Sequence, residues 1–197
     1  MPTVRAYIGL GANLGDAQAT LTAGVHALAA MPGATLRDVS PLYVTRPVEV
    51  TDQPDFHNAV AALDVPRGPE GGSGAIALLL ALKSIERAFG RQERARFGPR
   101  ELDLDLLIFG DAQLTVERPP DARSLDPEKD ANLLEVPHPR AADRLFVLAP
   151  LSDIAPELVP PGWRETVGQA RARRESVEGP DAVRETARWD AATQTWV

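Results

Sequence analysis

Two aspartates separated by one residue are the side chains whose type and spacing most directly suggest chemistry. Asp103 and Asp105 alternate with leucines in the run 102–106. A β-strand over this run points both carboxylates to one face and the leucines to the other. Neighbouring carboxylates disfavour each other's charged form unless a cation compensates, and Mg²⁺ is commonly held by one or two carboxylates plus substrate phosphates. The pair therefore indicates a metal site, although a strand with one solvent-exposed face shows the same pattern.

A local excess of arginine precedes the aspartates, in a chain with a formal charge of -7. Residues 87–100 contain one acidic residue, Glu93, and five arginines: Arg87, Arg91, Arg94, Arg96 and Arg100. Guanidinium groups bind phosphate oxygens in pairs, so a basic loop beside two carboxylates supplies the positioning and charge neutralisation that phosphoryl transfer requires. Arg140 and Arg144, one helical turn apart, could add a second basic wall. The alternative for both groups is ordinary solvated charge.

An aromatic ring and an amide share one face of another expected strand. Phe56 and Asn58 are two residues apart in the alternating run 55–65, so both side chains point the same way. A ring beside a group that donates and accepts hydrogen bonds suits a flat heterocycle. The alternatives are a core position for Phe56 and a loop contact for Asn58, and Phe146 has the same ambiguity.

The glycines at positions 9, 11 and 15 lie between an expected strand and an expected helix, where a dinucleotide-binding loop would lie. Their spacing is G-x-G-x-x-x-G rather than G-x-G-x-x-G, and the chain has no G-x-x-x-x-G-K-[ST] loop. Asp38 is only a loose match to the acid that a dinucleotide site requires. The sequence therefore disfavours a dinucleotide-binding fold.

Hydrophobic periodicity predicts the elements that must position these groups. We expect helices between Asp16 and Pro32 and between Gly74 and Gly90, and strands over 4–10, 36–43, 55–65 and 102–109. The order β-α-β-β-α-β predicts an α+β fold with a ferredoxin-like sheet and helices on its faces. We also expect an additional hairpin at Gly110-Asp111, an edge strand over 133–136 and a helix from Pro139 to about Ala149.

The length of 197 residues fits one compact domain. We expect that domain over residues 1–162, with residues 163–197 as a C-terminal extension. The extension holds all three tryptophans, Trp163, Trp189 and Trp196, so we expect at least part of it to pack on the domain. The charged, proline-rich stretch 118–132 is expected to be an exposed excursion.

Composition excludes several classes of protein. The net negative charge argues against a general nucleic-acid binder, and the absence of cysteine excludes disulfides and thiolate zinc sites. No segment approaches the roughly 18 apolar residues of a membrane span, and the N-terminus lacks a signal-peptide pattern. We therefore expect a cytoplasmic protein with neither a membrane nor a nucleic-acid partner.

Four blocks resemble the 6-hydroxymethyl-7,8-dihydropterin pyrophosphokinase family. They are residues 6–16, 52–59, 97–105 and 136–139, in this order, between about residues 4 and 160. The third block is the most specific and reads Phe97-Gly98-Pro99-Arg100-Glu101-Leu102-Asp103-Leu104-Asp105. Phe97 stands where tryptophan is common, Phe56 where tyrosine is frequent, and Lys83 where some members have glutamine.

The resemblance implies a Mg²⁺-dependent diphosphate transfer from ATP to the hydroxymethyl group of the pterin, with release of AMP, in folate biosynthesis. It implies two Mg²⁺ ions bridging ATP phosphates, Asp103 and Asp105. It implies a pterin between Phe56 and Phe146, with Asn58 and the loop from Thr45 to Val48 reading its edge. The implied ATP contacts are Lys83, Glu86, Arg91, Arg100, His138 and Arg144, of which Arg91 and Arg100 join the two aspartates in catalysis.

We expect a monomer that acts on these two small molecules, and which of Arg94 and Arg96 reaches the phosphates stays open. Two other functions also stay open. One is a different metal-dependent nucleotidyl or phosphoryl transferase on the same kind of sheet, since one fold hosts many chemistries. The other is a non-catalytic binding protein whose extension is the working surface.

Overall fold

A computed structural model describes residues 2–47, 52–69, 72–90, 100–119, 131–179 and 181–197. Within them, six strands form a central sheet: β1 (Thr3–Ala12), β2 (Thr35–Val39), β3 (Leu42–Thr45), β4 (Phe56–Pro66), β5 (Asp103–Phe109) and β8 (Val183–Ala187). The strand order is β5-β1-β4-β3-β8, and β2 also pairs with β4. All of these pairings are antiparallel. The chain is therefore α+β, as the sequence predicts.

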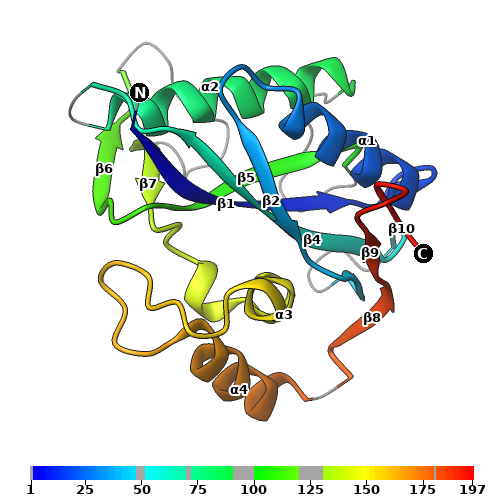
Figure 1. Cartoon of the computed structure of the whole chain (residues 1–197). Helices are drawn as coiled ribbons and strands as arrows, with labels where there is room; N and C mark the ends of the chain where they lie inside the picture. The colour runs from blue at the N-terminus through cyan, green and yellow to red at the C-terminus, as the bar shows by residue number, and fades with distance from the viewer. Residues whose placement is uncertain (1, 48–51, 70–71, 91–99, 120–130, 180) are drawn as a thin grey trace.

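Helices cover both faces of this sheet (Figure 1). On one face lie α1 (Ala17–Ala29) and α2 (Ser73–Ala88), and on the other lie α3 (Leu145–Ile154) and α4 (Val167–Glu178). Helix α1 begins where expected, because the Asp16 carboxylate accepts a hydrogen bond from the Ala19 amide at 3.0 Å. Its apolar stripe of Leu21, Val25 and Leu28 is fully buried.

The central strand β1 contributes to a core on each face. Ile8 and Leu10 are buried in the larger core under α1 and α2. Tyr7 is buried in a second core with Leu148 and Leu151 of α3. Both faces of β1 are covered from Ala6 to Ala12, and this part of the strand has no charged residue, whereas Thr3 and Arg5 near its start are exposed.

The expected second strand is in fact two strands, β2 and β3. Ser40 and Pro41 separate them, and proline has no backbone N–H to donate to a ladder. Ser40 bridges the gap, because its amide donates to the Val60 carbonyl and its hydroxyl accepts from the Val60 amide, both at 2.9 Å. The predicted strand is therefore present but interrupted, and both of its parts pair with β4.

The additional hairpin exists, but not at Gly110-Asp111 as predicted. β6 (Leu114–Glu117) pairs with β7 (Asn132–Val136) in a separate two-stranded sheet and does not pair with β5. Gly110 adopts a positive φ of 55°, a conformation that glycine accepts without strain and that turns the chain out of the central sheet.

The expected helix from Pro139 to about Ala149 is displaced toward the C-terminus. A 3-10 turn, η2 (Ala141–Asp143), precedes α3, which continues through Pro150 to Ile154. Pro150 removes one helical hydrogen bond, but α3 buries Leu148 and Leu151 completely. The free energy gained by burying these two leucines exceeds the free energy lost with the missing hydrogen bond.

The C-terminal extension packs on the rest of the molecule. α4 packs against α3, and β8 pairs with β3. A small hairpin follows, formed by β9 (Trp189–Asp190) and β10 (Thr195–Trp196). The Trp196 ring is buried in the larger core, and its Nε1 donates to the Ser40 carbonyl at 2.9 Å. No helix in the described ranges is long and apolar enough to cross a membrane.

Replacing Trp196 by alanine tests this packing. Trp196 is 2% exposed, so the Trp196→Ala variant should lower the free energy of unfolding by about 3–5 kcal/mol. The control is Val197, which is 72% exposed. Val197→Ala should change the free energy of unfolding by less than about 0.5 kcal/mol. Chemical denaturation measures both, and equal values would show that the hairpin does not belong to the core.

Candidate functional site

A row of paired residues crosses the sheet on the face toward α3. Tyr43 of β3 pairs with Asn58 of β4, Asn58 with Gly11 of β1, and Gly11 with Asp103 of β5. Directly paired residues project to the same face. A Cβ atom on Gly11 would lie 3.6 Å from Asn58 Oδ1 and 3.9 Å from Asp103 Cβ. Because residue 11 is glycine, β1 places no side chain between the amide and the carboxylate, and we call this gap the open strip.

The two aspartates lie as the alternating pattern predicts. Asp103 and Asp105 are partly exposed, whereas Leu104 and Leu106 are buried in the larger core. Arg100 forms an ion pair with Asp103. The described residues contain no group of three or more histidine, cysteine or acidic side chains that could hold a metal. A pair of carboxylate oxygens fits Mg²⁺ that takes its remaining ligands from phosphates and water.

Side chains of α2 satisfy the backbone of β5 between these aspartates. Glu86 is 1% exposed, and its Oε1 accepts hydrogen bonds from the Leu104 amide at 2.7 Å and from Lys83 Nζ at 2.8 Å. Lys83 Nζ also donates to the Leu104 carbonyl at 3.1 Å. β5 is an edge strand of the sheet. Glu86 and Lys83 therefore provide the hydrogen-bond partners that a neighbouring strand would provide to the Leu104 amide and carbonyl. They thereby fix the backbone that carries both carboxylates.

Sequence reasoning did not single out Asn13, which connects three parts of the site. Its side-chain Oδ1 accepts a hydrogen bond from the backbone N–H of Arg100 at 2.7 Å, and its backbone N–H donates to the Arg100 carbonyl at 3.1 Å. Its Nδ2 donates to Gln53 Oε1 and to the Pro54 carbonyl, both at 3.1 Å. Asn13 is 2% exposed, and a buried amide with this many partners fixes the segments it joins. Its only sequence signal is its place in the first matching block.

The predicted ring-binding residues of β3 and β4 lie together. Asn58 Nδ2 donates to Thr45 Oγ1 at 3.0 Å and, more weakly, to the Phe56 carbonyl at 3.4 Å. Asn58 and Thr45 are buried, whereas Phe56 is partly exposed. The amide nitrogen is thus held by the protein, and Oδ1 is the atom that lies beside the open strip at Gly11.

The start of α3 brings a ring and a cation to the same face. Phe146 packs on the cluster formed by Tyr43, Leu145, Ala149 and Val183. The Arg144 guanidinium lies 5.5 Å from the centroid of the Phe146 ring, within range of a cation–π contact. Burial and then Arg140 lower the pKa of Arg144, while Asp105 and Asp103 raise it. Arg144 stays charged and lies between the aromatic side and the carboxylate side.

His138 attaches the segment after β7 to the site. Its backbone amide donates to the Leu107 carbonyl of β5 at 2.8 Å. Its ring Nδ1 accepts from the Arg140 amide at 3.2 Å. A neutral ring with an accepting Nδ1 carries its proton on Nε2, so Nε2 is a hydrogen-bond donor.

Several predicted site residues fall outside the described ranges. They are Val48 of the edge-reading loop and Arg91, Arg94, Arg96 and Phe97 of the arginine-rich segment. The remaining predicted residues lie around one face and one edge of the sheet. The structure therefore brings together Thr45, Phe56, Asn58, Lys83, Glu86, Arg100, Asp103, Asp105, His138, Arg144 and Phe146.

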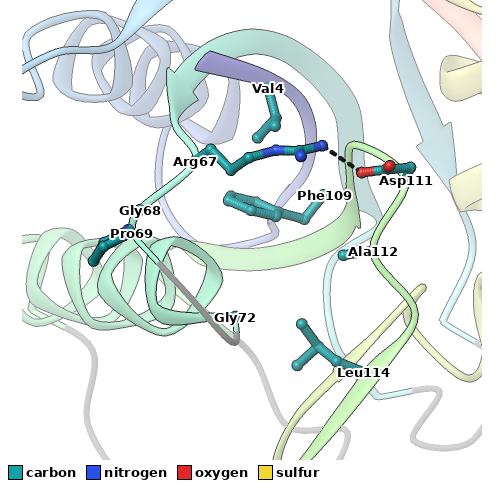
Figure 2. A pocket seen from close by; sticks show the side chains of 9 residues that line it. All are labelled: Val4, Arg67, Gly68, Pro69, Gly72, Phe109, Asp111, Ala112 and Leu114. Carbon is teal, nitrogen blue, oxygen red and sulfur yellow. Dashed lines mark hydrogen bonds and ion pairs between the residues drawn. The ribbon is translucent and has the colours of Figure 1, made fainter. Parts of the chain in front are cut away.

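A separate cavity of about 290 Å³ lies at the other end of β1 (Figure 2). Val4 and Phe109 line it, and Arg67 forms an ion pair with Asp111 across it at 2.6 Å. Gly11 lies about 23 Å further along β1 at the usual rise of a strand. This cavity therefore shares no residue with the row at Gly11.

Comparison with known proteins gives one consistent result. Residues 7–156 match the family described as 7,8-dihydro-6-hydroxymethylpterin-pyrophosphokinase (HPPK). A protein of Pseudomonas aeruginosa named 2-amino-4-hydroxy-6-hydroxymethyldihydropteridine pyrophosphokinase is 40% identical over 160 residues, which is 81% of this chain and 86% of that protein. A protein of the same name from Methylorubrum extorquens is 41% identical over 169 residues, or 86% of this chain and 92% of that protein.

A solved structure supports the same fold. The crystal structure of Plasmodium falciparum HPPK-DHPS with pterin and p-hydroxybenzoate superposes with a TM-score of 0.74 at 15% identity. The match covers 100% of this chain but 48% of that chain, so this protein spans about half the length of that structure. Family, relatives and fold agree, and the chain belongs to the 7,8-dihydro-6-hydroxymethylpterin-pyrophosphokinase family.

Proposed function

We propose that this chain transfers diphosphate from ATP to 6-hydroxymethyl-7,8-dihydropterin and releases AMP, as a step of folate biosynthesis. The row from Asn58 through Gly11 to Asp103 carries the proposal, because it sets a ring-reading amide and a metal-binding carboxylate on the two sides of an open strip. The names of the curated relatives support the same activity. ATP and the pterin alcohol are then the two substrates.

The pterin side consists of two rings and hydrogen-bonding groups. Phe56 and Phe146 stack on the faces of the pterin, and Asn58 Oδ1 accepts hydrogen bonds from its N–H groups. Thr45 holds Asn58 Nδ2 at 3.0 Å, which fixes the orientation of the amide. The loop from Thr45 to Val48 completes the recognition of the pterin edge.

The phosphate side combines anionic and cationic residues. Asp103 and Asp105 hold two Mg²⁺ ions, which neutralise phosphate charge when ATP is bound. Arg91, Arg100, His138 and Arg144 bind the phosphates, and Lys83 and Glu86 contact the nucleotide while they hold β5 in place. Arg144 is partly buried, and its electrostatic interactions are therefore stronger than those of a fully exposed arginine.

The reaction requires positioning rather than a covalent intermediate. The hydroxymethyl oxygen of the pterin attacks the β-phosphorus of ATP, and the bond from that phosphorus to the oxygen bridging the α- and β-phosphates breaks. The diphosphate passes to the pterin and AMP leaves. The chain aligns the attacking oxygen and stabilises charge on the transferred group, which are the main contributions of a protein to such a transfer.

The proposal extends to the architecture and setting of the protein. The strand order β5-β1-β4, with β2 and β3 on the far edge of β4, supports a ferredoxin-like sheet. Residues 1–162 form the catalytic domain, and residues 163–197 form an extension packed on it. The protein acts as a cytoplasmic monomer. For comparison, the name of the Arabidopsis thaliana relative carries the word mitochondrial.

AMP formation tests the proposed reaction directly. The enzyme should release AMP from ATP only when the hydroxymethyl dihydropterin and Mg²⁺ are present. Asp103→Asn and Asp105→Asn should each lower kcat by about 100-fold or more. Each variant would hold Mg²⁺ less well, and the negative charge of the transferred phosphates would then lack its compensation in the transition state. Asp111→Asn, in the cavity at the other end of the sheet, is the control. Release of ADP, or full activity of either site variant with an intact circular dichroism spectrum, would overturn the mechanism.

The open strip at Gly11 gives a second test. A Cβ at Gly11 meets only ordinary contacts, so Gly11→Ala and Gly11→Val should fold normally. The side chains that they add would occupy space between Asn58 and Asp103 and displace the pterin. The KM for the pterin should therefore rise in Gly11→Ala and rise further, by about tenfold or more, in Gly11→Val. The control is Gly24→Ala on the other face, where a Cβ would lie 3.3 Å from Leu102. Gly24→Ala should leave the KM for the pterin unchanged. An unchanged KM in both Gly11 variants would place the substrate elsewhere.

A third test concerns Glu86. Glu86→Ala leaves the buried Leu104 amide without its acceptor and Lys83 without its ion-pair partner, which should cost about 1–3 kcal/mol of stability, the penalty of an unsatisfied buried donor. Glu86→Gln keeps an oxygen for the Leu104 amide and should recover part of that loss. Chemical denaturation measures both variants. Equal stability of Glu86→Ala and the wild type would show that this contact does not hold β5.

A further inference from the structure

Arg171 of α4 joins the C-terminal extension to two elements of the proposed site. Its Nη1 donates to Asp153 Oδ1 at 2.8 Å and to the Ala149 carbonyl at 3.4 Å, both on α3. Its Nε donates to Glu175 Oε1 at 2.7 Å, which fixes the direction of the side chain. Asp153 Oδ2 accepts from the Tyr43 hydroxyl at 2.6 Å. A continuous polar chain thus joins α4, α3 and β3.

Tyr43 connects this chain to the pterin side. It is 4% exposed and pairs with Asn58 across the sheet. Burial, together with the hydrogen bond to Asp153, raises the pKa of the Tyr43 hydroxyl, so the hydroxyl stays protonated and remains the donor. The Tyr43 ring belongs to the cluster on which Phe146 packs, and Val183 of the extension belongs to it too. The extension therefore contributes both packing and a polar link behind Phe146.

Arg173, on the same helix, contacts the segment that carries Arg144. Its Nη2 donates to the Ala142 carbonyl at 2.9 Å, and its Nη1 lies 3.8 Å from Asp143 Oδ1. Both partners belong to η2, which ends at the residue before Arg144. Glu165 holds the Arg173 guanidinium from the other side at 2.9 Å. The turn that leads into Arg144 is thus attached to α4.

We propose that the C-terminal extension positions Phe146 and Arg144 for the reaction, with Arg171 and Arg173 as its positioning residues. This inference rests on the proposed function for the roles of Phe146 and Arg144. The family match ends at residue 156, so both arginines lie beyond it. Arg171 acts through Tyr43 and α3 on the ring that stacks on the pterin. Arg173 acts through η2 on the cation that binds the phosphates.

Steady-state kinetics of AMP release, with each substrate varied in turn, separates the two links. Arg171→Ala should raise the KM for the pterin by about tenfold, and Arg173→Ala should raise the KM for ATP by a similar factor, because small displacements of a positioning group weaken alignment. Arg174→Ala is the matched control, since Arg174 pairs with Glu178 on its own helix and should leave both constants unchanged. A purely structural role would lower the melting temperature and the active fraction without moving either KM.

Two further variants and one independent readout complete the test. Arg171→Lys and Arg173→Lys keep the charge with a smaller donor set, so they should fold and show KM values between those of the wild type and the alanine variants. Amide hydrogen exchange over residues 145–151 should be faster in Arg171→Ala than in Arg174→Ala, whether or not the enzyme turns over. Absence of AMP release by the wild type would overturn the proposed function alone. Exchange and KM values equal to the control would overturn the positioning role.

Discussion

The register of β1 between β4 and β5 is the constraint on which the rest of the site depends. Gly11 pairs with Asn58 on one side and with Asp103 on the other. Side chains alternate between faces along a strand, so a slip of one residue in either pairing would turn Asn58 or Asp103 into the apolar core. Such a slip would also bring leucines such as Leu104 out of that core. Burial of apolar surface on the α1 and α2 face therefore determines the chemistry on the opposite face.

β5 carries Asp103 and Asp105 at the end of the strand order, where half of its backbone groups lack a strand to pair with. Glu86 and Lys83 meet that requirement at Leu104, between the two aspartates. A buried carboxylate is stable only when it is paired and hydrogen-bonded, and Glu86 has both kinds of partner. The ion pair with Lys83 thus offsets the cost of burying Glu86. The contacts of both residues with Leu104 also fix the part of β5 that carries Asp103 and Asp105. Lys83 and Glu86 lie three residues apart on α2, within one helical turn, so one side of the helix presents both side chains to β5.

Local features of the fold and site were predictable from the sequence, and long-range ones were not. The alternation around Asp103 and Asp105 and the start of a helix after Asp16 depend on neighbours in sequence, and both were predicted. The pairing of β6 with β7 and the passage of α3 through Pro150 depend on tertiary packing, which overrides local turn and helix signals. Asn13 is another example, because its partners Arg100 and Gln53 lie 87 and 40 residues away.

The charges of the site are arranged so that each stabilises another. Arg100 pairs with Asp103, while Arg144 lies near both aspartates and over the Phe146 ring. Without a nucleotide, these contacts limit the repulsion among the cations and between the carboxylates. Under the proposed function, the phosphates of ATP would pair with the arginines and Mg²⁺ would pair with the aspartates, in place of these contacts. Arg144 lies between η2 and α3, and α4 contacts both of these elements. The proposed positioning of Arg144 by the C-terminal extension follows from these contacts.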